Sequence, residues 1–267
     1  METNKTHYRS IFISDIHLGT RGCQANKLAA FLKAHTCDDL YLVGDVIDGW
    51  RLRSGFYWPQ EHSNVLRRFL TASKRGTRVT YVTGNHDEFL RKYSDLEVGN
   101  IRFVDEAVHE TADGRRLLVI HGDQYDVITR YHRWLAFLGD IGYNLLLAAN
   151  RYVDLVRRKL GYGYWSLSAY LKHRVKKAVN FIGEFETAIA RQCELSGYQG
   201  VVCGHIHHAE ITDIGSIRYM NCGDWVESCT ALVEDENGQF KILRWVEELS
   251  SEDLEADVVD LTEPEAA

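Results

Sequence analysis

The sequence predicts an α/β fold with much parallel sheet, and two observations support that prediction. Short apolar runs typical of strands recur along the chain, and each ends in a glycine or a polar cluster. Segments with helical spacing lie between the first of these runs. Strands that alternate with helices are typical of parallel sheets covered by helices. With 267 residues, of which 45% are hydrophobic, the chain is long enough to bury a substantial core.

The expected elements can be placed in chain order. Five runs are typical of strands, at residues 10–14, 40–43, 79–83, 117–120 and 199–203. Residues 26–35 and 64–75 repeat apolar side chains at helical intervals. In the first of these helices, Leu28, Phe31 and Leu32 share one face.

The spacing of polar residues behind the strands indicates one long insertion. The first intervals are 30, 40 and 36 residues, measured between Asp15, Asp45, Asn85 and His121. Each is about the length of one strand–helix–strand unit. The next interval, from His121 to His205, is 84 residues, so a further segment is inserted there. The inserted stretch, about residues 125–194, has almost continuous helical spacing with a break near 161–164.

The insertion is basic, whereas the rest of the chain is acidic. Residues 130–177 contain ten Lys and Arg against two Asp, although the whole chain has a net charge of −7. The acidic total argues against nucleic acid as a partner. The basic residues either solvate exposed helix faces or form a lid over an anionic substrate. We expect a domain at 1–245 with a helical lid at about 125–194, and a disordered acidic tail at 246–267.

The cysteines and the lengths of the apolar runs indicate where in the cell the protein is located. None of the six cysteines forms a CxxC pair, and Cys203 and Cys222 lie in apolar contexts that suit a small buried side chain. This usage and the absence of a signal peptide favour a reducing cytoplasm. No run reaches the roughly 18 apolar residues that a membrane span needs. We expect a cytoplasmic protein whose basic lid can contact the inner membrane.

Five short polar motifs stand directly after the five expected strands. They are SDIH (Asp15, His17), GDVID (Asp45, Asp48), GNHD (Asn85, His86, Asp87), HGD (His121, Asp123) and GHIH (His205, His207). Ligands of open α/β sheets bind outside the carboxyl ends of the strands, so these motifs are expected to converge on one site. A lone Asp or His in such a place is more often a cap, a turn residue or a satisfied polar group. Five clusters together favour a functional site, and the glycines before three of them let the backbone approach closely.

The converging side chains are typical of a metal centre. Carboxylates, an amide oxygen and at least four imidazoles, without thiolate, suit Mn²⁺, Fe, Zn²⁺ or Mg²⁺. Seven ligand atoms exceed what one ion accepts, so we expect two divalent ions that share a carboxylate. Residues two apart on an extended segment point the same way, so Asp15 should align with His17, and His205 with His207. Two such ions activate a water molecule and neutralise charge in phosphoryl displacement.

The set D-x-H, GDxxD, GNHD, H-G and GHxH resembles the signature of the calcineurin-like metallophosphoesterase superfamily, over roughly residues 8–233. The resemblance implies a four-layer α/β sandwich, in which two packed β-sheets are flanked by helices. It implies one metal shell of Asp15, His17, Asp45 and His207, and a second of Asp45, Asn85, His121 and His205. It also implies that His86 faces the scissile phosphate as a general acid or charge stabiliser, oriented by Asp87.

Within that superfamily the chain looks most like the UDP-2,3-diacylglucosamine diphosphatases of lipid A biosynthesis. The points of likeness are the length, the HGD motif and the helical insert, which in that family forms a lid over acyl chains. The resemblance places Ser168, Lys172 and Lys176 near the substrate, with Asp126 and Arg51 as further candidates. One departure is GNHD, because those diphosphatases typically carry GNRD, and the chain resembles a sister group in this respect.

Three functions are compatible with these motifs. The first is a Mn²⁺-dependent pyrophosphatase that cleaves a nucleotide-linked lipid precursor at the membrane surface. The second is the same hydrolysis of a water-soluble nucleotide diester, dinucleotide or phosphoprotein. The third is a non-catalytic scaffold, which the complete ligand set disfavours. In each case His208 is surplus to the ligands, and we expect it at the rim of the site.

Overall fold

The computed structural model describes residues 5–125 and 182–245. The chain divides into two compact units, one of Met1–Asp123 with Ala190–Ala267 and one of Gln124–Ile189. All strands within the described residues and all expected metal ligands belong to the first unit. The description that follows therefore concerns that unit.

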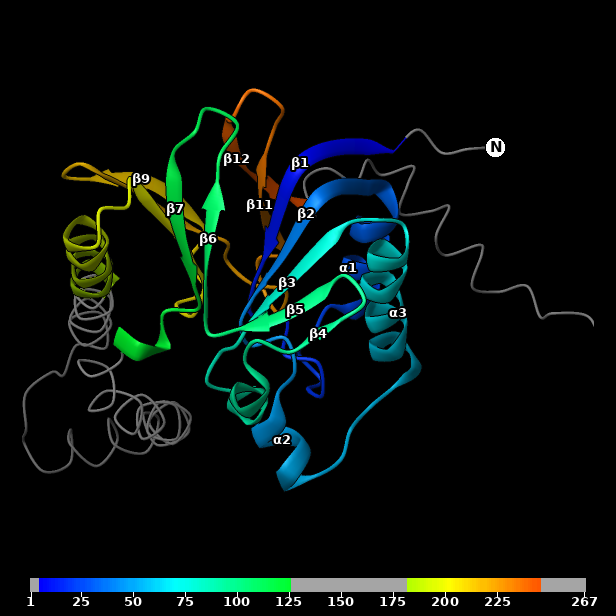
Figure 1. Cartoon of the computed structure of the whole chain (residues 1–267). Coiled ribbons are helices and arrows are strands. Elements are labelled where there is room, and N and C mark those ends of the chain that lie inside the picture. Colours follow the sequence, from blue (N-terminus) through cyan, green and yellow to red (C-terminus); the bar gives the residue numbers. More distant parts are fainter. Residues whose placement is uncertain (1–4, 126–181, 246–267) are drawn as a thin grey trace, which may run out of the picture. The chain divides into compact units, whose positions relative to one another are not determined.

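One sheet has seven strands in the order β12-β11-β1-β2-β3-β5-β4 (Figure 1). Its strands are β1 (Thr6–Ile13), β2 (His35–Val43), β3 (Arg78–Val82), β4 (Glu97–Val98), β5 (Ile101–Val104), β11 (Thr230–Glu234) and β12 (Phe240–Arg244). β1, β2, β3 and β5 run parallel, whereas β4, β11 and β12 pair antiparallel with their neighbours. The expected strands at 10–14, 40–43 and 79–83 are confirmed as its central parallel strands.

A second sheet has five strands in the order β6-β7-β8-β10-β9. Its strands are β6 (Glu106–Glu110), β7 (Arg116–Ile120), β8 (Gly200–Cys203), β9 (Glu210–Ile214) and β10 (Ile217–Asn221). β7, β8 and β10 run parallel, and the edge strands β6 and β9 pair antiparallel. β7 and β8 are neighbours although the long insertion separates them in sequence, so the motifs behind them meet at one sheet edge. Two mixed sheets are thus confirmed.

Helices flank the sheets. α1 (Ala25–Ala34) and α3 (Gln60–Lys74) confirm the two helices expected from apolar spacing. α2 (Gly49–Ser54) and two 3₁₀ helices, η1 (Glu88–Tyr93) and η2 (Asp123–Tyr125), follow polar motifs directly. In the part of the chain that the structure describes, no helix is long and apolar enough to cross a membrane.

Only the last part of the expected insertion is described, and residues 182–195 are helical there. The candidate lid residues Asp126, Ser168, Lys172 and Lys176 lie outside the described residues. The acidic segment 246–267 lies outside them too. The lid and the tail therefore stay predictions from the sequence.

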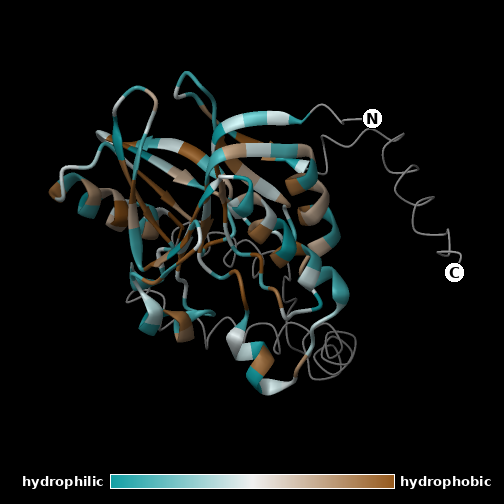
Figure 2. Cartoon of the chain, turned by 45° about the vertical axis from the view of Figure 1, so that its right-hand side comes forward, coloured by the Kyte–Doolittle hydropathy of each residue, from teal (hydrophilic) through white to brown (hydrophobic). Residues whose placement is uncertain are grey.

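Two hydrophobic cores lie on opposite faces of the seven-stranded sheet, because successive side chains of a strand alternate. On β1, Ile11 and Ile13 belong to the core that includes α1 and α3. Phe12, between them, belongs to the core shared with Val119 and Val202 of the five-stranded sheet. Strand segments buried on both faces are continuous apolar runs, and residues 11–13 at the end of β1 form such a run. In Figure 2 the hydrophobic residues gather along the strands, whereas the turns of the hairpins are mostly hydrophilic.

A buried polar chain links the two sheets. The hydroxyl of Tyr41 on β2 lies 3.2 Å from Nδ1 of His109 on β6. Nε2 of His109 lies 2.7 Å from Oε2 of Glu234 on β11, and Oε1 of Glu234 accepts the N–H of Ala112 at 2.8 Å. Burial raises the pKa of Glu234, but the contacts with His109 and Ala112 outweigh it and hold the pKa below its usual value. Glu234 is therefore ionised and satisfied inside the fold.

Candidate metal centre

The expected ligands lie in loops with an uncommon backbone conformation. Asp15, His17, Asp45, His205 and His207 all have positive φ, between 51° and 71°. Only two other non-glycine residues in the described ranges do. This left-handed region costs residues with a Cβ roughly 1–2 kcal/mol, and Asn, Asp and His adopt it most readily. The expectation that D-x-H and H-x-H are extended is wrong, because β1 and β8 end before these residues and the backbone turns there. Asp15 and His17 belong to one ligand group, whereas His205 and His207 belong to two different groups.

Two glycines let these loops approach each other. A Cβ on Gly84 would lie 2.5 Å from the backbone nitrogen of Asp45. A Cβ on Gly204 would lie 2.5 Å from Oδ2 of Asp15. Both distances are below any real Cβ contact, so only glycine fits at these two positions without displacing a ligand. The expected role of these glycines is confirmed.

Three imidazoles converge on one carboxylate oxygen of Asp45. The Nε2 atoms of His17, His86 and His121 lie 3.8, 3.9 and 3.4 Å from Oδ2 of Asp45. The other oxygen, Oδ1, accepts the backbone N–H of His86 at 2.8 Å. Asp45 is only 2% exposed. Its carboxylate is thus fixed by one oxygen, and the other is presented to ring nitrogens from three different loops.

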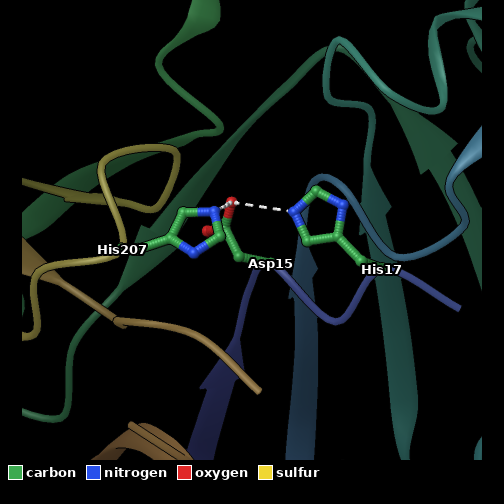
Figure 3. A group of neighbouring side chains, drawn as sticks. All are labelled: Asp15, His17 and His207. Atoms are coloured by element: carbon green, nitrogen blue, oxygen red, sulfur yellow. Dashed lines mark ion pairs between the residues drawn. The ribbon is translucent and has the colours of Figure 1, made fainter. Parts of the chain in front are cut away.

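A second group of ligand atoms surrounds Asp15. Oδ1 of Asp15 lies 3.2 Å from Nε2 of His207 and 4.0 Å from Nε2 of His17. Oδ2 accepts the backbone N–H of His205 at 2.9 Å. Figure 3 shows the carboxylate between the two rings. The loops after β1 and β8, which come from different sheets, therefore meet here as the motifs predict.

The candidate ligand atoms form three overlapping groups. In each group all atoms lie within 4.8 Å of one another, and the groups are Asp15–His17–His207, Asp45–His121–His205 and His17–Asp45–His86. The first group holds three residues of one expected shell but lacks Asp45, and the second holds the aspartate and both histidines of the other expected shell. The third contains His17 and Asp45 together with His86, so Asp45 lies within reach of residues from both of the other groups.

Buried atoms without hydrogen-bond partners show that these residues fit cations. Among such atoms in the described part of the chain is Oδ1 of Asn85. Oδ1 of Asp15 and Nε2 of His121 form no hydrogen bond either, although they lie 3.2 Å from His207 and 3.4 Å from Asp45. Leaving such an atom unsatisfied costs about 1–3 kcal/mol. Nδ1 of His121 lies 2.9 Å from the carbonyl oxygen of Val43, so Nδ1 donates its proton there and Nε2 keeps a lone pair for a metal. All three atoms belong to expected ligands, and the site therefore fits divalent metal ions.

The electrostatics of the site also favour cations. Burial raises the pKa of Asp45, but His121 and the other imidazoles outweigh it and hold the pKa far below its usual value. For Asp15, His207 and His121 outweigh burial in the same way. Burial lowers the pKa of His121, yet Asp45 and Asp15 raise it well above its ordinary value. A field that holds extra protons on imidazoles also attracts metal ions, which compete with those protons.

Asp48 orients two of the rings. Its Oδ2 lies 3.0 Å from Nδ1 of His86 and 3.3 Å from Nδ1 of His17. Its Oδ1 accepts the N–H of Arg51 at 2.8 Å and caps α2. Burial raises the pKa of Asp48, but the two imidazoles and the cap outweigh it and lower the pKa. With both Nδ1 atoms facing Asp48, both Nε2 atoms are directed towards Asp45.

Asp87 does not take the role expected of it. Asp48 faces the His86 ring, while Asp87 is buried beneath the loop. Its carboxylate accepts hydrogen bonds from the Gly84 N–H at 2.5 Å, the Val46 N–H at 2.9 Å and the Tyr81 hydroxyl at 2.7 Å. Burial and the nearby charge of Asp45 raise the pKa of Asp87. Asp87 therefore braces the loop rather than orienting His86.

Two site residues escaped the sequence prediction. Asp48 was recognised only as part of GDVID, although it follows a strand end like the assigned ligands. Trp50 packs against His86, with ring centroids 4.2 Å apart and the ring planes tilted by 37°. His208 behaves as expected of a rim residue, since Nε2 lies 3.3 Å from Oε2 of Glu210 and its side chain is 53% exposed.

A cluster of buried carboxylates and imidazoles at the strand ends of two mixed sheets defines a metal-dependent phosphohydrolase. A family model for calcineurin-like phosphoesterases matches residues 8–209. The chain therefore belongs to the calcineurin-like phosphoesterase family, and it is a metal-dependent phosphoesterase.

Similar proteins are known by name. The chain is 26% identical over 242 residues to a UDP-2,3-diacylglucosamine hydrolase of Pseudomonas syringae pv. tomato, covering 85% of this chain and 92% of the relative. It is 24% identical to the enzyme of the same name from Aliivibrio fischeri, covering 80% and 90%. A solved structure of a hypothetical protein from Pyrococcus horikoshii superimposes with a TM-score of 0.46 at 11% identity, covering 97% of this chain and 95% of that one.

Proposed function

We propose that this phosphoesterase holds two divalent ions and hydrolyses the diphosphate of a nucleotide-linked lipid. The supporting observation for two ions is that Asp45 belongs to two ligand groups at once. One ion would be held by Asp15, His17, Asp45 and His207, and the other by Asp45, Asn85, His121 and His205. Mixed carboxylate, amide and imidazole ligands favour Mn²⁺, with Fe, Zn²⁺ and Mg²⁺ as alternatives.

Besides holding the ions, the chain supplies a residue that faces the leaving oxygen. Bound divalent ions supply Lewis-acid activation of water and neutralise phosphoryl charge. The side chain of His86 is 21% exposed, whereas that of His121 is fully buried, so His86 is the ring near Asp45 that can meet a substrate. Because Nδ1 of His86 faces Asp48, its Nε2 is the atom that gives a proton to the leaving oxygen or stabilises its charge.

The lipid substrate is supported by the relatives and by the composition of the insertion. Two relatives named UDP-2,3-diacylglucosamine hydrolase align over most of both chains. The basic and apolar insertion, which lies outside the described residues, has the composition that a diphosphate attached to acyl chains requires. Ser168, Lys172, Lys176 and Asp126 of that insertion are proposed substrate contacts. On this proposal the protein acts in the cytoplasm in lipid A biosynthesis, peripherally on the inner membrane.

A water-soluble substrate is the second candidate. The observation that favours it is His86, since the lipid diphosphatases that the chain resembles typically carry arginine at this position. A soluble nucleotide diester, dinucleotide or phosphoprotein would be cleaved by the same centre. A scaffold without catalysis is disfavoured because every expected ligand is present in the clustered loops.

Hydrolysis assays with two substrates separate these candidates. The full chain loaded with Mn²⁺ is assayed on UDP-2,3-diacylglucosamine in mixed micelles and on bis(p-nitrophenyl) phosphate. We expect kcat/KM to be at least 100-fold higher for the lipid, and His121→Ala to abolish both activities while His208→Ala keeps them. Faster turnover of the soluble diester, indifferent to detergent, would establish the second candidate instead. No hydrolysis and no thermal stabilisation by Mn²⁺ would leave only a scaffold.

A further inference from the structure

A basic pocket lies next to the loops of the metal centre, and one of its residues is Arg51, a candidate substrate contact from the sequence. It has a volume of about 380 Å³ and is lined by the loop that follows His17 and by α2 with the residues after it. Two arginines, Arg21 and Arg51, contribute to the lining. No acidic residue of the described chain lines it. The pocket is therefore positively charged.

The pocket walls continue directly from the catalytic loops. The backbone N–H and the hydroxyl of Thr20 donate to the carbonyl oxygen of His17 at 3.1 and 2.9 Å. On the other wall, the N–H of Arg51 donates to Asp48, whose second oxygen faces His86. A ligand in this pocket would thus contact the segments that hold a metal ligand and the residue that orients His86.

Both guanidinium groups are available to an anion. Arg21 and Arg51 are exposed, and neither forms an ion pair within residues 5–125 and 182–245. The Cζ atom of Arg21 lies 4.8 Å from the ring centroid of Tyr57, so the ring supports the guanidinium plane. A stacked guanidinium keeps its fork of N–H donors free, and that fork matches the oxygens of a phosphate.

The recess extends beyond this pocket. A second pocket of about 360 Å³ shares Thr20, Arg21 and Tyr57 with the first and continues to polar residues that include Lys27 and the acidic Glu61. Each pocket has the volume of a small-ligand site. With two arginines and no acid, the first pocket suits an anionic group, and the mixed lining of the second suits a polar, uncharged group.

We propose that this recess is a second anion subsite, which binds a phosphate-bearing part of the substrate beyond the phosphate that is cleaved. Arg21 and Arg51 hold that group, and Tyr57 fixes Arg21. The proposal rests on the proposed function, because it assumes a substrate with more than one anionic group. The same chemistry would accept a free phosphate compound that acts as an effector, and the experiment distinguishes the two sources.

The test compares two probes on the Mn²⁺-loaded full chain. Dissociation constants of uridine diphosphate and inorganic phosphate are measured by calorimetry for the wild type, Arg21→Gln and Arg51→Gln. Arg53→Gln is the matched control, because Arg53 is exposed on the same helix and does not line the pocket. We expect each pocket variant to weaken uridine diphosphate at least tenfold and inorganic phosphate less than threefold. The control should change neither.

The mode of inhibition identifies the source of the anion. Competitive inhibition of bis(p-nitrophenyl) phosphate hydrolysis by uridine diphosphate means that one ligand spans both sites, whereas non-competitive inhibition or activation means a separate effector. Equal weakening of both probes, or a uridine diphosphate affinity within twofold of wild type, overturns the subsite. If the wild type does not cleave the lipid but its uridine diphosphate affinity still depends on the arginines, the subsite holds and the lipid assignment fails.

Discussion

Replacement of Asp48 by Asn measures how much of the reaction depends on the orientation of His86. The carboxylate Oδ2 lies 3.0 Å from Nδ1 of His86 and 3.3 Å from Nδ1 of His17. The side-chain amide of Asn is neutral, so the negative charge beside both rings is lost. The 3.0 Å contact between Nδ1 of His86 and the carboxylate is a close contact with a charged group, and such contacts contribute up to about 1.5–3 kcal/mol. Since 1.36 kcal/mol corresponds to tenfold in rate, loss of the His86 contact in the transition state should lower kcat by roughly 10- to 200-fold.

The assay follows kcat and KM for bis(p-nitrophenyl) phosphate, with the metal content of each variant measured in parallel. The Asn side chain keeps an oxygen for the N–H of Arg51, so the cap of α2 and the melting temperature should be preserved. Asp38→Asn, at an exposed acid, is the control. A kcat within threefold of wild type at full metal content would refute the reasoning, and a loss of metal would show that Asp48 acts through His17.

Other changes test the ligand loops, the bound ions and the buried carboxylate of Glu234. Gly84→Ala places a Cβ 2.5 Å from the nitrogen of Asp45, so we expect a stability loss of about 1–3 kcal/mol by thermal unfolding and less bound metal; full metal content would contradict this. Mn²⁺ at 100 times its Kd should stabilise the fold by about 2.7 kcal/mol in calorimetry, and His208→Ala should keep that gain. Because the pKa of Glu234 is lowered by folding, its stabilisation is present above about pH 4.3 and is lost as the pH falls through the folded pKa. Glu234→Gln should therefore flatten the acid side of a plot of melting temperature against pH, and an unchanged slope would count against it.

The sequence predicts the strands that lead into the candidate site well. Each of them combines two signals, an apolar run and a polar motif directly after it. The strands around Phe12, Val43 and Val119 are buried on both faces, so they can be recognised in the sequence as apolar runs. β4, β5, β6 and β9 to β12 were not among the five expected strands, which were recognised by the ligand motifs that follow them. The turn between β11 and β12 nevertheless contains Asn237-Gly238, a strong hairpin signal.

The site was predicted in composition but not in conformation. Which residues would gather followed from the rule that ligands bind at strand ends, and the described ligands do gather. The backbone conformation of Asp15 and His207 could not be read from periodicity, because a loop of a few residues has none. The roles of Asp48 and Asp87 depend on which carboxylate lies beside His86, a matter of a few ångströms that sequence spacing does not resolve.

At five ligand positions the left-handed backbone lowers the stability of the fold, while the side chain at the same position serves as a ligand. Each of these residues holds a conformation that glycine would adopt with less strain, and the difference is of order 1 kcal/mol apiece. A glycine at Asp15 or His205 would therefore relax the backbone while it removes a ligand. Copies of this fold released from selection for hydrolysis should accumulate glycine at these positions, so that a lost centre leaves a recognisable trace in the sequence.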